Sequence, residues 1–289
     1  MRSDVPRLLA GAIVGPYQLI RRVGGGSGGD VYLALDTALQ RLSAFKLLAA
    51  DPGDEGRPEA IRRFLAEAAT LRMLSHPDIV AFHGAGDWHG RPWLAMEWLP
   101  GHDLTRYTEP ARLLPDALVL DIGIRLALAL AYAHAQGVVH RDIKPGNVRI
   151  DLASGLLKIA DFGVSRSNDA TQTRTGVVLG SPAYMAPEQL AGAASDAGCD
   201  LYSLGVVIFE LFTGRRPHES ASLGELLRKV ANEPAPDVRR VRPQLHVTVA
   251  DLLARQLARC PTDRYPDGYA LADALARARL HTARPDVQP

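Results

Sequence analysis

A short polar turn in the middle of the chain carries side chains that could move a phosphoryl group. The segment His140–Asn147 follows two valines and presents Asp142, Lys144 and Asn147 at fixed offsets. The carboxylate of Asp142 can accept a hydroxyl proton, the ammonium of Lys144 can neutralise a phosphoryl group in transfer, and the amide oxygen of Asn147 can bind Mg²⁺. An apolar run then ends in Asp161-Phe162-Gly163, where Asp161 offers Mg²⁺ a carboxylate. Two ordinary turns would have to produce this order by accident.

A glycine cluster near the N-terminus is a second candidate for phosphate chemistry. Gly24, Gly26, Gly29 and Val31 fit the pattern G-x-G-x-x-G-x-V. Glycines let backbone N–H groups approach phosphate oxygens closely, although a flexible hairpin tip would have the same composition. A dinucleotide-binding fold would place a helix after the glycines. The strand-like Val-Tyr-Leu-Ala-Leu that follows disfavours that fold.

Two further charged residues gain significance only as a pair. Lys46 lies in an otherwise apolar strand, where a lysine either extends to the strand edge or holds an anion. Glu67 lies beside the apolar stripe of a predicted helix, where a glutamate is usually solvated. We expect both to be functional if Glu67 pairs with Lys46.

Composition limits the class of protein. The chain has 289 residues, of which 47% are hydrophobic, and 33 basic residues stand against 32 acidic ones. This is the composition of a globular protein with a substantial core, and a net charge of +1 argues against binding of nucleic acid through bulk charge. Two cysteines exclude a disulfide framework and favour a reducing compartment, so we predict a cytoplasmic location. Apolar segments are short or interrupted by Arg125 and His134, so no membrane span is predicted.

The elements that must position these residues change in character along the chain. The first third reads as strands with one amphipathic helix, and the remainder as helices. We therefore expect two lobes joined near residues 97–101. The predicted strands are Tyr17–Val23, Val31–Asp36, Leu42–Leu48, Ile79–Phe82 and Trp93–Trp98, and the predicted helices are Glu59–Leu74, Asp116–Ala135, Asp200–Phe212, Leu223–Val230, Val247–Arg259 and Gly268–Arg279.

Together, these motifs resemble a protein kinase catalytic domain, most closely the bacterial Ser/Thr kinases of eukaryotic (Hanks) type. Six signatures of that family occur here in the family's order. They are Gly24–Val31, Lys46, Glu67, His140–Asn147, Asp161–Gly163 and Ala186-Pro187-Glu188. Asp200 and Arg264 also match, the first as a brace of the catalytic loop and the second as the partner of Glu188. The resemblance covers roughly residues 15–280.

The resemblance implies an α+β protein-kinase-like bilobal fold. A small antiparallel β lobe with one main helix would span about residues 15–98, and a larger, mostly α-helical lobe would span 99–280. The whole of 1–289 would form a single catalytic domain with a frayed tail at 281–289, and the active site would lie in the cleft between the lobes.

The resemblance also implies roles for individual residues. Lys46, held by Glu67, would contact the ATP phosphates, Asp142 and Lys144 would act on the acceptor hydroxyl and the phosphoryl group, and Asn147 and Asp161 would hold Mg²⁺. Met96 matches the gatekeeper, and Glu97 to Leu99 match the hinge that binds adenine. The nucleotide-binding residues are then Val23, Gly24, Gly26, Gly29, Val31, Ala44, Lys46, Met96, Glu97, Leu99 and Arg149.

Regulation is implied by the loop before the Ala-Pro-Glu segment. Arg141 precedes the catalytic aspartate, as in kinases whose activation loop needs a phosphate for that arginine to bind. Thr171, Thr173 and Thr175 are the candidate autophosphorylation sites, and their hydroxyls have no role if the loop is merely polar. Ser181 stands where the family usually has a threonine that bonds the catalytic aspartate and lysine.

One departure concerns the nucleotide. Arg149 occupies a position where the family usually has Leu or Met beneath the adenine ring. Its guanidinium could stack on the base or turn aside to solvent.

The expected activity is transfer of the γ-phosphoryl group of ATP to Ser or Thr hydroxyls of proteins. The cofactors would be ATP and Mg²⁺, with Mn²⁺ as an alternative, and a homodimer would allow autophosphorylation. A nucleotide-binding pseudokinase scaffold is a second hypothesis, against which the intact catalytic residues argue. A small-molecule kinase is a third, but those generally lack the Ala-Pro-Glu segment and the late arginine. The physiological substrate cannot be predicted from the sequence.

Overall fold

The computed structural model describes residues 10–26, 29–48, 57–162, 182–193 and 196–282. The chain divides at Pro100 and Gly101 into two units, here called unit 1 and unit 2. Each is described by itself. Gly163, Thr171, Thr173, Thr175 and Ser181 lie outside the described residues, as does most of the predicted tail.

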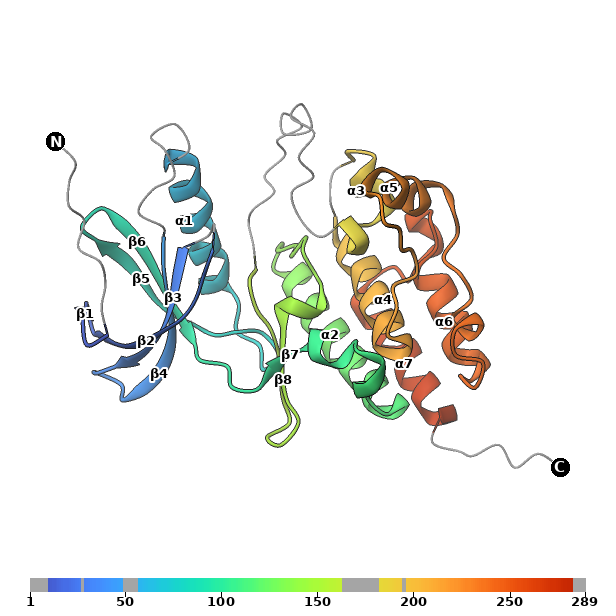
Figure 1. Cartoon of the computed structure of the whole chain (residues 1–289), viewed down its shortest axis with the longest axis horizontal. Helices are drawn as coiled ribbons and strands as arrows, with labels where there is room; N and C mark the ends of the chain where they lie inside the picture. The colour runs from blue at the N-terminus through green and yellow to red at the C-terminus, as the bar shows by residue number, and fades with distance from the viewer. Residues whose placement is uncertain (1–9, 27–28, 49–56, 163–181, 194–195, 283–289) are drawn as a thin grey trace. The chain divides into compact units, whose positions relative to one another are not determined.

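Unit 1 is built on a six-stranded antiparallel sheet with the strand order β1-β2-β3-β4-β6-β5. One helix, α1 (Arg57–Met73), accompanies it and contacts β5 and β6 (Figure 1). The strands are β1 (Ile13–Val14), β2 (Tyr17–Gly26), β3 (Gly29–Asp36), β4 (Arg41–Leu47), β5 (Phe82–Trp88) and β6 (Arg91–Glu97). β2, β3 and β4 are consecutive antiparallel neighbours and so form a meander, in agreement with the antiparallel β lobe that the resemblance implied.

The period-2 alternation of β4 sends neighbouring side chains to opposite faces of the sheet. Phe45 is fully buried with Tyr17 and Trp93, and the three rings pack with centroids 5.2 to 5.6 Å apart. These aromatic pairs anchor a core on one face of the sheet. Lys46, the next residue, is thereby directed to the other face.

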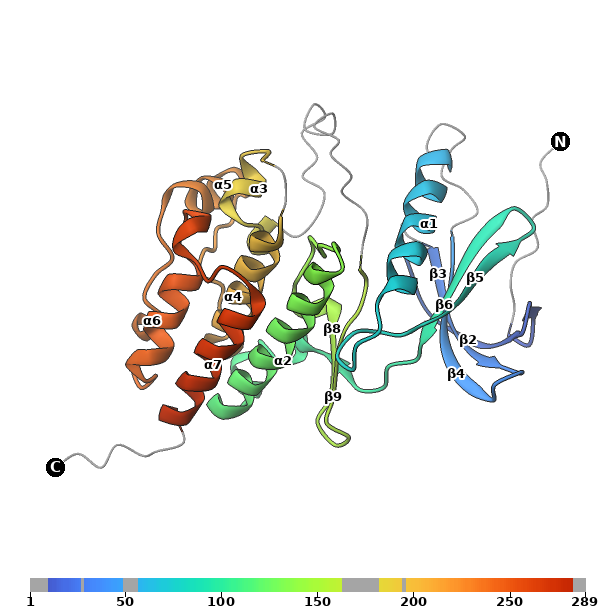
Figure 2. The ribbon, with the colours of Figure 1, turned by 180° about the vertical axis from the view of Figure 1, so that it is seen from behind.

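Unit 2 is organised around two apolar helices, α2 (Asp116–Ala135) and α4 (Ala197–Thr213). Almost every residue of α4 is buried, as its apolar sequence predicts. α7 (Gly268–Thr282) and α4 both contact α2, and α6 (Val247–Gln256) contacts α4 and α7. α5 (Leu223–Asn232) and the short α3 (Pro187–Leu190) pack on each other (Figures 1 and 2).

A three-stranded antiparallel sheet carries the candidate catalytic segments of unit 2. Its order is β7-β8-β9, with β7 at His102–Asp103, β8 at Val148–Asp151 and β9 at Leu156–Ile159. The 3-10 turns η1 (Leu104–Tyr107) and η3 (Pro145–Asn147) lie beside it and contact each other. β8 begins immediately after Asn147, and β9 ends two residues before Asp161.

Among the described residues, one helix has the length and hydropathy of a membrane span. It is α2, a 20-residue helix whose most apolar 18 residues have a mean hydropathy of 1.6, although Arg125 and His134 were expected to interrupt this run. Of this apolar stretch, 56% is buried inside the fold, as in the core helix of a globular protein.

The structure differs from the sequence expectations at several points. β5 spans Phe82–Trp88, whereas the sequence predicted a strand at Ile79–Phe82. The prediction missed this strand because its two glycines obscure the alternating pattern of a strand. The helical spacing of the apolar residues places Leu65 in the apolar stripe of α1, but its side chain is 50% exposed. A free cysteine in a globular protein is usually buried, but Cys260 is exposed. α7 continues through Thr282, two residues into the segment expected to be frayed.

Candidate functional site

In unit 1, Lys46 and Glu67 form a close ion pair. The Lys46 Nζ donates to both carboxylate oxygens of Glu67, at 2.8 and 2.9 Å, across 21 residues of sequence. Both side chains are largely buried, with 18% and 12% exposure. α1 presents Glu67 on its inward face and β4 presents Lys46 toward it. The pair on which the functional interpretation of these residues depended is therefore present.

Several of the predicted nucleotide-binding residues share the face of the sheet that carries Lys46. Ala44 lies two residues before Lys46 on β4 and is directly opposite Met96 on β6. Val31 is directly opposite Lys46 on β3. Directly opposed residues in an antiparallel ladder project to the same face, so unit 1 brings Val31, Ala44, Lys46 and Met96 together. Met96 and Leu99 are buried.

The described glycines of the cluster lie where β2 and β3 pair at their adjoining ends. Gly24 pairs with Val31, and Gly26 pairs with Gly29. Val23 lies at an irregularity in the register between Arg22 and Gly24. Gly29 has a φ of +120°, and a Cβ there would collide with the carbonyl of Leu47. Only glycine fits this position, whereas around Gly24 there is open space.

Glu97 ends β6 and is tied to the segment before β5. Its backbone N–H donates to the Ala81 carbonyl at 2.8 Å, and its Oε2 accepts the Ala81 N–H at 3.2 Å. These two bonds fix the start of the segment that was predicted to bind adenine.

In unit 2, the buried carboxylate of Asp200 on α4 holds the start of the catalytic segment. Its Oδ2 accepts the backbone N–H of His140 at 2.8 Å, and its Oδ1 accepts that of Arg141 at 2.7 Å. The Nε2 of His134 on α2 also lies 2.9 Å from Oδ2. Arg141 has a φ of +68°, a strained value for a residue other than glycine. Asp200 stabilises this backbone conformation.

The side chains of Lys144 and Asn147 both donate hydrogen bonds to Asp142. The Lys144 Nζ donates to Asp142 Oδ2 at 2.6 Å. The Asn147 Nδ2 donates to the same oxygen at 3.0 Å and to the Asp142 carbonyl at 2.8 Å. These bonds fix the Asp142 carboxylate in place. Because the Asn147 amide nitrogen makes both bonds, its oxygen is left as a ligand atom for a cation.

His140 connects Asp142 to the segment that precedes Asp161. Its Nδ1 accepts the Asp142 N–H at 3.2 Å, and its Nε2 lies 3.0 Å from the Ala160 carbonyl. Both bonds fit the neutral imidazole with its proton on Nε2. The Ala160 N–H in turn donates to the Asn147 carbonyl at 2.8 Å. Asp161 follows with a φ of +52°, another strained position.

Arg149 projects from β8, directly opposite Asp103 on β7 and Lys158 on β9. Its Nη2 donates to the Gly101 carbonyl at 2.6 Å. The guanidinium is thus hydrogen-bonded to the backbone. The sequence analysis expected it either to stack on the base or to turn aside to solvent, and neither alternative included this bond.

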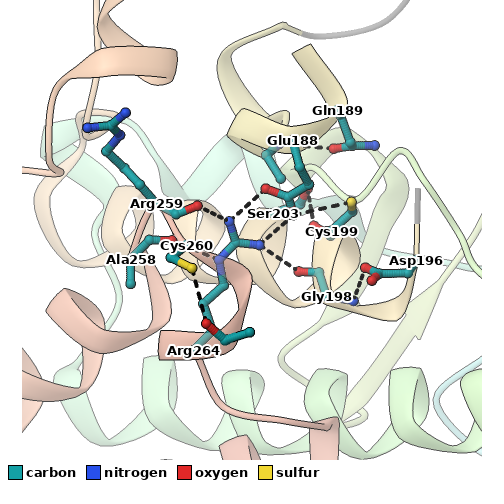
Figure 3. Close-up of polar contacts among 12 residues, drawn as sticks. Glu188, Gln189, Asp196, Gly198, Cys199, Ser203, Ala258, Arg259, Cys260 and Arg264 are labelled. Atoms are coloured by element: carbon teal, nitrogen blue, oxygen red, sulfur yellow. Dashed lines mark hydrogen bonds and ion pairs between the residues drawn. The ribbon is translucent and has the colours of Figure 1, made fainter. Parts of the chain in front are cut away.

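A second ion pair lies in unit 2, between Glu188 on α3 and Arg264, which directly follows the 3-10 turn Pro261–Asp263 (Figure 3). The guanidinium donates to both carboxylate oxygens at 2.6 and 2.7 Å, and also to the carbonyls of Ala258 and Arg259. The Arg264 side chain is 1% exposed. Burial by itself would raise the pKa of Glu188, but the hydrogen bonds and charge of Arg264 outweigh it and lower that pKa. The predicted pairing of these two residues is present.

Near this ion pair lies a group of three side chains, two carboxylates and a thiol, whose atoms are close enough together to hold a metal ion. Among the described residues it is the one such group. It consists of Glu188, Asp196 and Cys199. Both Glu188 oxygens already accept from Arg264, and Cys199 donates to Oε1 at 3.4 Å. Burial, then the Glu188 charge, raises the pKa of the Cys199 thiol to about 12. Glu188 and Cys199 are thus part of the ion-pair network, whereas the Asp196 side chain accepts the Gly198 N–H at the start of α4.

Two residues that contact the candidate site were not predicted from the sequence as site residues. His134 and Arg125 were noted only as interruptions of the apolar run that became α2. Their signal was the cost of placing a charged or polar side chain within an apolar helix, which implies a specific partner.

Comparison with known proteins agrees with this geometry. Residues 17–275 match the family model described as protein kinase domain. The chain is 38% identical over 278 residues to the Ser/Thr-protein kinase PknJ of Mycobacterium tuberculosis, covering 94% of this chain and 46% of PknJ. It is 36% identical to PrkC of Bacillus subtilis, covering 89% of this chain and 40% of PrkC. The crystal structure of the M. tuberculosis PknI kinase domain superposes with a TM-score of 0.72 at 32% identity, covering 94% of this chain and 100% of that one.

The chain therefore belongs to the protein kinase domain family, in its bacterial Hanks-type Ser/Thr branch, and has the kinase fold. It spans about half the length of the curated relatives PknJ and PrkC.

We expect Glu188→Gln to destabilise the protein by about 3 kcal/mol at pH 7, because it leaves the buried Arg264 without its counter-ion. The folded-state pKa of Glu188 is lower than the unfolded value of 4.5, so the ion pair stabilises the fold above pH 4.5 and this contribution is lost as pH falls below it. Urea unfolding at pH 7 and below pH 4 measures the difference.

The matched control is Glu219→Gln, which removes an exposed ion pair with Arg216 at 3.8 Å. This change should alter stability little at either pH. A Glu188→Gln cost that does not shrink in acid would contradict the assigned pair.

Proposed function

We propose that this chain transfers the γ-phosphoryl group of ATP to Ser or Thr hydroxyls of protein substrates. The observation that carries the proposal is the group formed by Asp142, Lys144 and Asn147, held on the buried Asp200. The membership of this chain in the protein kinase domain family and the names of its bacterial relatives support the same activity.

Asp142 is assigned as the residue that orients the acceptor hydroxyl and takes its proton. Its carboxylate is fixed by the 2.6 Å bond from Lys144 and the 3.0 Å bond from Asn147. A fixed acceptor reduces the entropy lost on reaching the transition state. Lys144 also supplies positive charge where the phosphoryl group passes to the hydroxyl.

We assign Asn147 and Asp161 as the residues that hold a divalent cation, and Mg²⁺ as the cation, with Mn²⁺ as an alternative. An amide oxygen and a carboxylate are the hard oxygen donors that Mg²⁺ prefers, so the donor set fits. The bound cation would neutralise charge on the ATP phosphates. Lys46, fixed by Glu67, is assigned to the same phosphates, and the β2–β3 hairpin to their backbone contacts.

The remaining assignments belong to this proposal. Val23, Val31, Ala44, Met96, Glu97 and Leu99 would contact the nucleotide. Thr171, Thr173 and Thr175 would be autophosphorylated, with a homodimer as the arrangement that allows it, and Ser181 would bond the catalytic residues. A cytoplasmic location is proposed from the low cysteine content. Residues 1–289 are proposed to form one catalytic domain.

We expect Asp142→Asn to lower kcat by about 10³-fold, because the amide cannot take the hydroxyl proton. Binding of Mg·ADP should change less than about 3-fold, since Asp142 is not assigned to the nucleotide. Phosphate transfer to a generic protein substrate and calorimetric titration with Mg·ADP measure the two effects. If wild type and Asp142→Asn transferred phosphate equally little while both bound Mg·ADP, the scaffold hypothesis would replace the kinase.

We expect Arg149 to contact the nucleobase through its methylene stem, because its guanidinium is bonded to the Gly101 carbonyl. Arg149→Met, which keeps an unbranched stem, should leave the KM for ATP within about 2-fold of wild type. Arg149→Ala should raise that KM about 5-fold, which corresponds to the loss of about 1 kcal/mol of apolar contact. An equal rise in both variants would show instead that the guanidinium contacts the base.

A further inference from the structure

α2 contains an arginine whose position in an apolar helix requires an explanation. Arg125 lies near the middle of Asp116–Ala135, next to the buried Ile122 and Leu126, and is itself partly buried. A charged side chain in such surroundings is costly unless strong hydrogen bonds compensate. Its place in the helix therefore indicates a specific contact.

That contact is with the β8–β9 hairpin, which lies beside α2 in both views (Figures 1 and 2). The Arg125 Nη1 donates to the Gly155 carbonyl at 2.9 Å, and Nη2 donates to the Leu157 carbonyl at 3.5 Å. Gly155 has a φ of +70° in the turn between the strands. β9 is the edge strand of its sheet, so its outer carbonyls need partners from outside the sheet. Arg125 bridges the turn and this edge.

The other end of the hairpin carries the two residues assigned to the cation. Asn147 directly precedes β8, and Asp161 follows β9 by two residues, with the Ala160 N–H bonded to the Asn147 carbonyl. The four-pair ladder from Val148–Ile159 to Asp151–Leu156 joins the two ends. A twist or tilt of the hairpin at the Gly155 end is thus carried to Asn147 and Asp161.

We propose that Arg125 is a positioning residue for divalent-cation binding, acting by anchoring the β8–β9 hairpin to α2. This inference rests on the proposed function only in assigning Asn147 and Asp161 to the cation. Charge-assisted hydrogen bonds to carbonyls are stronger than neutral ones, and the 2.9 Å bond to Gly155 ties the turn of the hairpin directly to α2. The apolar side chains of β8 and β9 hold the hairpin in the core, and Arg125 fixes how it is oriented there.

The test compares Arg125→Met, which loses both donors, with Arg125→Lys, which keeps one charged donor. Arg279→Met is the matched control, because Arg279 also reaches α2, through an ion pair with Asp121, but does not contact the hairpin. Binding of Mn²⁺ is measured by electron paramagnetic resonance at saturating ADP. ADP binding without metal, and the Mg²⁺ dependence of phosphate transfer, are measured on the same preparations.

Arg125→Met should weaken Mn²⁺ binding about 3- to 10-fold, with ADP binding without metal unchanged and kcat at saturating Mg²⁺ within 2-fold of wild type. Arg125→Lys should recover most of the loss, and Arg279→Met should match wild type. A cation affinity unchanged in Arg125→Met, or lowered equally in Arg279→Met, overturns the assignment.

Two outcomes separate this inference from the proposed function. If wild type itself binds no Mn²⁺ in the presence of ADP, the assigned cation site is wrong and the inference falls with it. If wild type binds Mn²⁺ and transfers phosphate but Arg125→Met binds Mn²⁺ with the same affinity, only the inference fails. Should Arg125→Met not fold, the same criteria apply to Arg125→Gln, which keeps an amide donor.

Discussion

The catalytic segment of unit 2 depends on one buried carboxylate. Asp200 is inaccessible to solvent, and its oxygens accept the backbone N–H groups of His140 and Arg141 and lie within hydrogen-bond distance of His134. A buried anion is tolerated only when hydrogen bonds replace its hydration. Here those bonds are the ones that hold Arg141 in its left-handed conformation. The turn that follows therefore has one geometry, and Asp142, Lys144 and Asn147 meet within it.

The two central helices of unit 2 serve this segment from different directions. α4 supplies Asp200 itself. α2 supplies His134, which lies against Asp200, and Arg125, which holds the β8–β9 hairpin. His140 then links the turn to the end of the hairpin through the Asp142 N–H and the Ala160 carbonyl. The turn that carries Asp142 and Asn147 and the segment before Asp161 thus belong to one hydrogen-bonded network within unit 2, and its supports are residues of the helical core.

Much of the fold and site could be predicted from the sequence because local patterns determine it. The apolar period gave the meander and α2 at their observed positions, and motif order indicated the pairs Lys46–Glu67 and Glu188–Arg264. β5 could not be located in the same way, because its glycines lack strand propensity and tertiary pairing with β6 decides its extent. The Arg149 contact with Gly101 and the Arg125 contact with Gly155 depend on backbone carbonyls brought near by the fold. No spacing in the sequence encodes them.

Under the proposed function, the Asp200 carboxylate organises the turn that carries Asp142 for catalysis. Asp200→Asn tests this most directly, because the side chain keeps its size while its amide group presents N–H donors to backbone N–H groups. We predict that kcat falls about 10²-fold, as expected for the loss of two charge-assisted hydrogen bonds, with Mg·ADP affinity within about 3-fold of wild type. A kcat for Asp200→Asn within 3-fold of wild type would contradict the account.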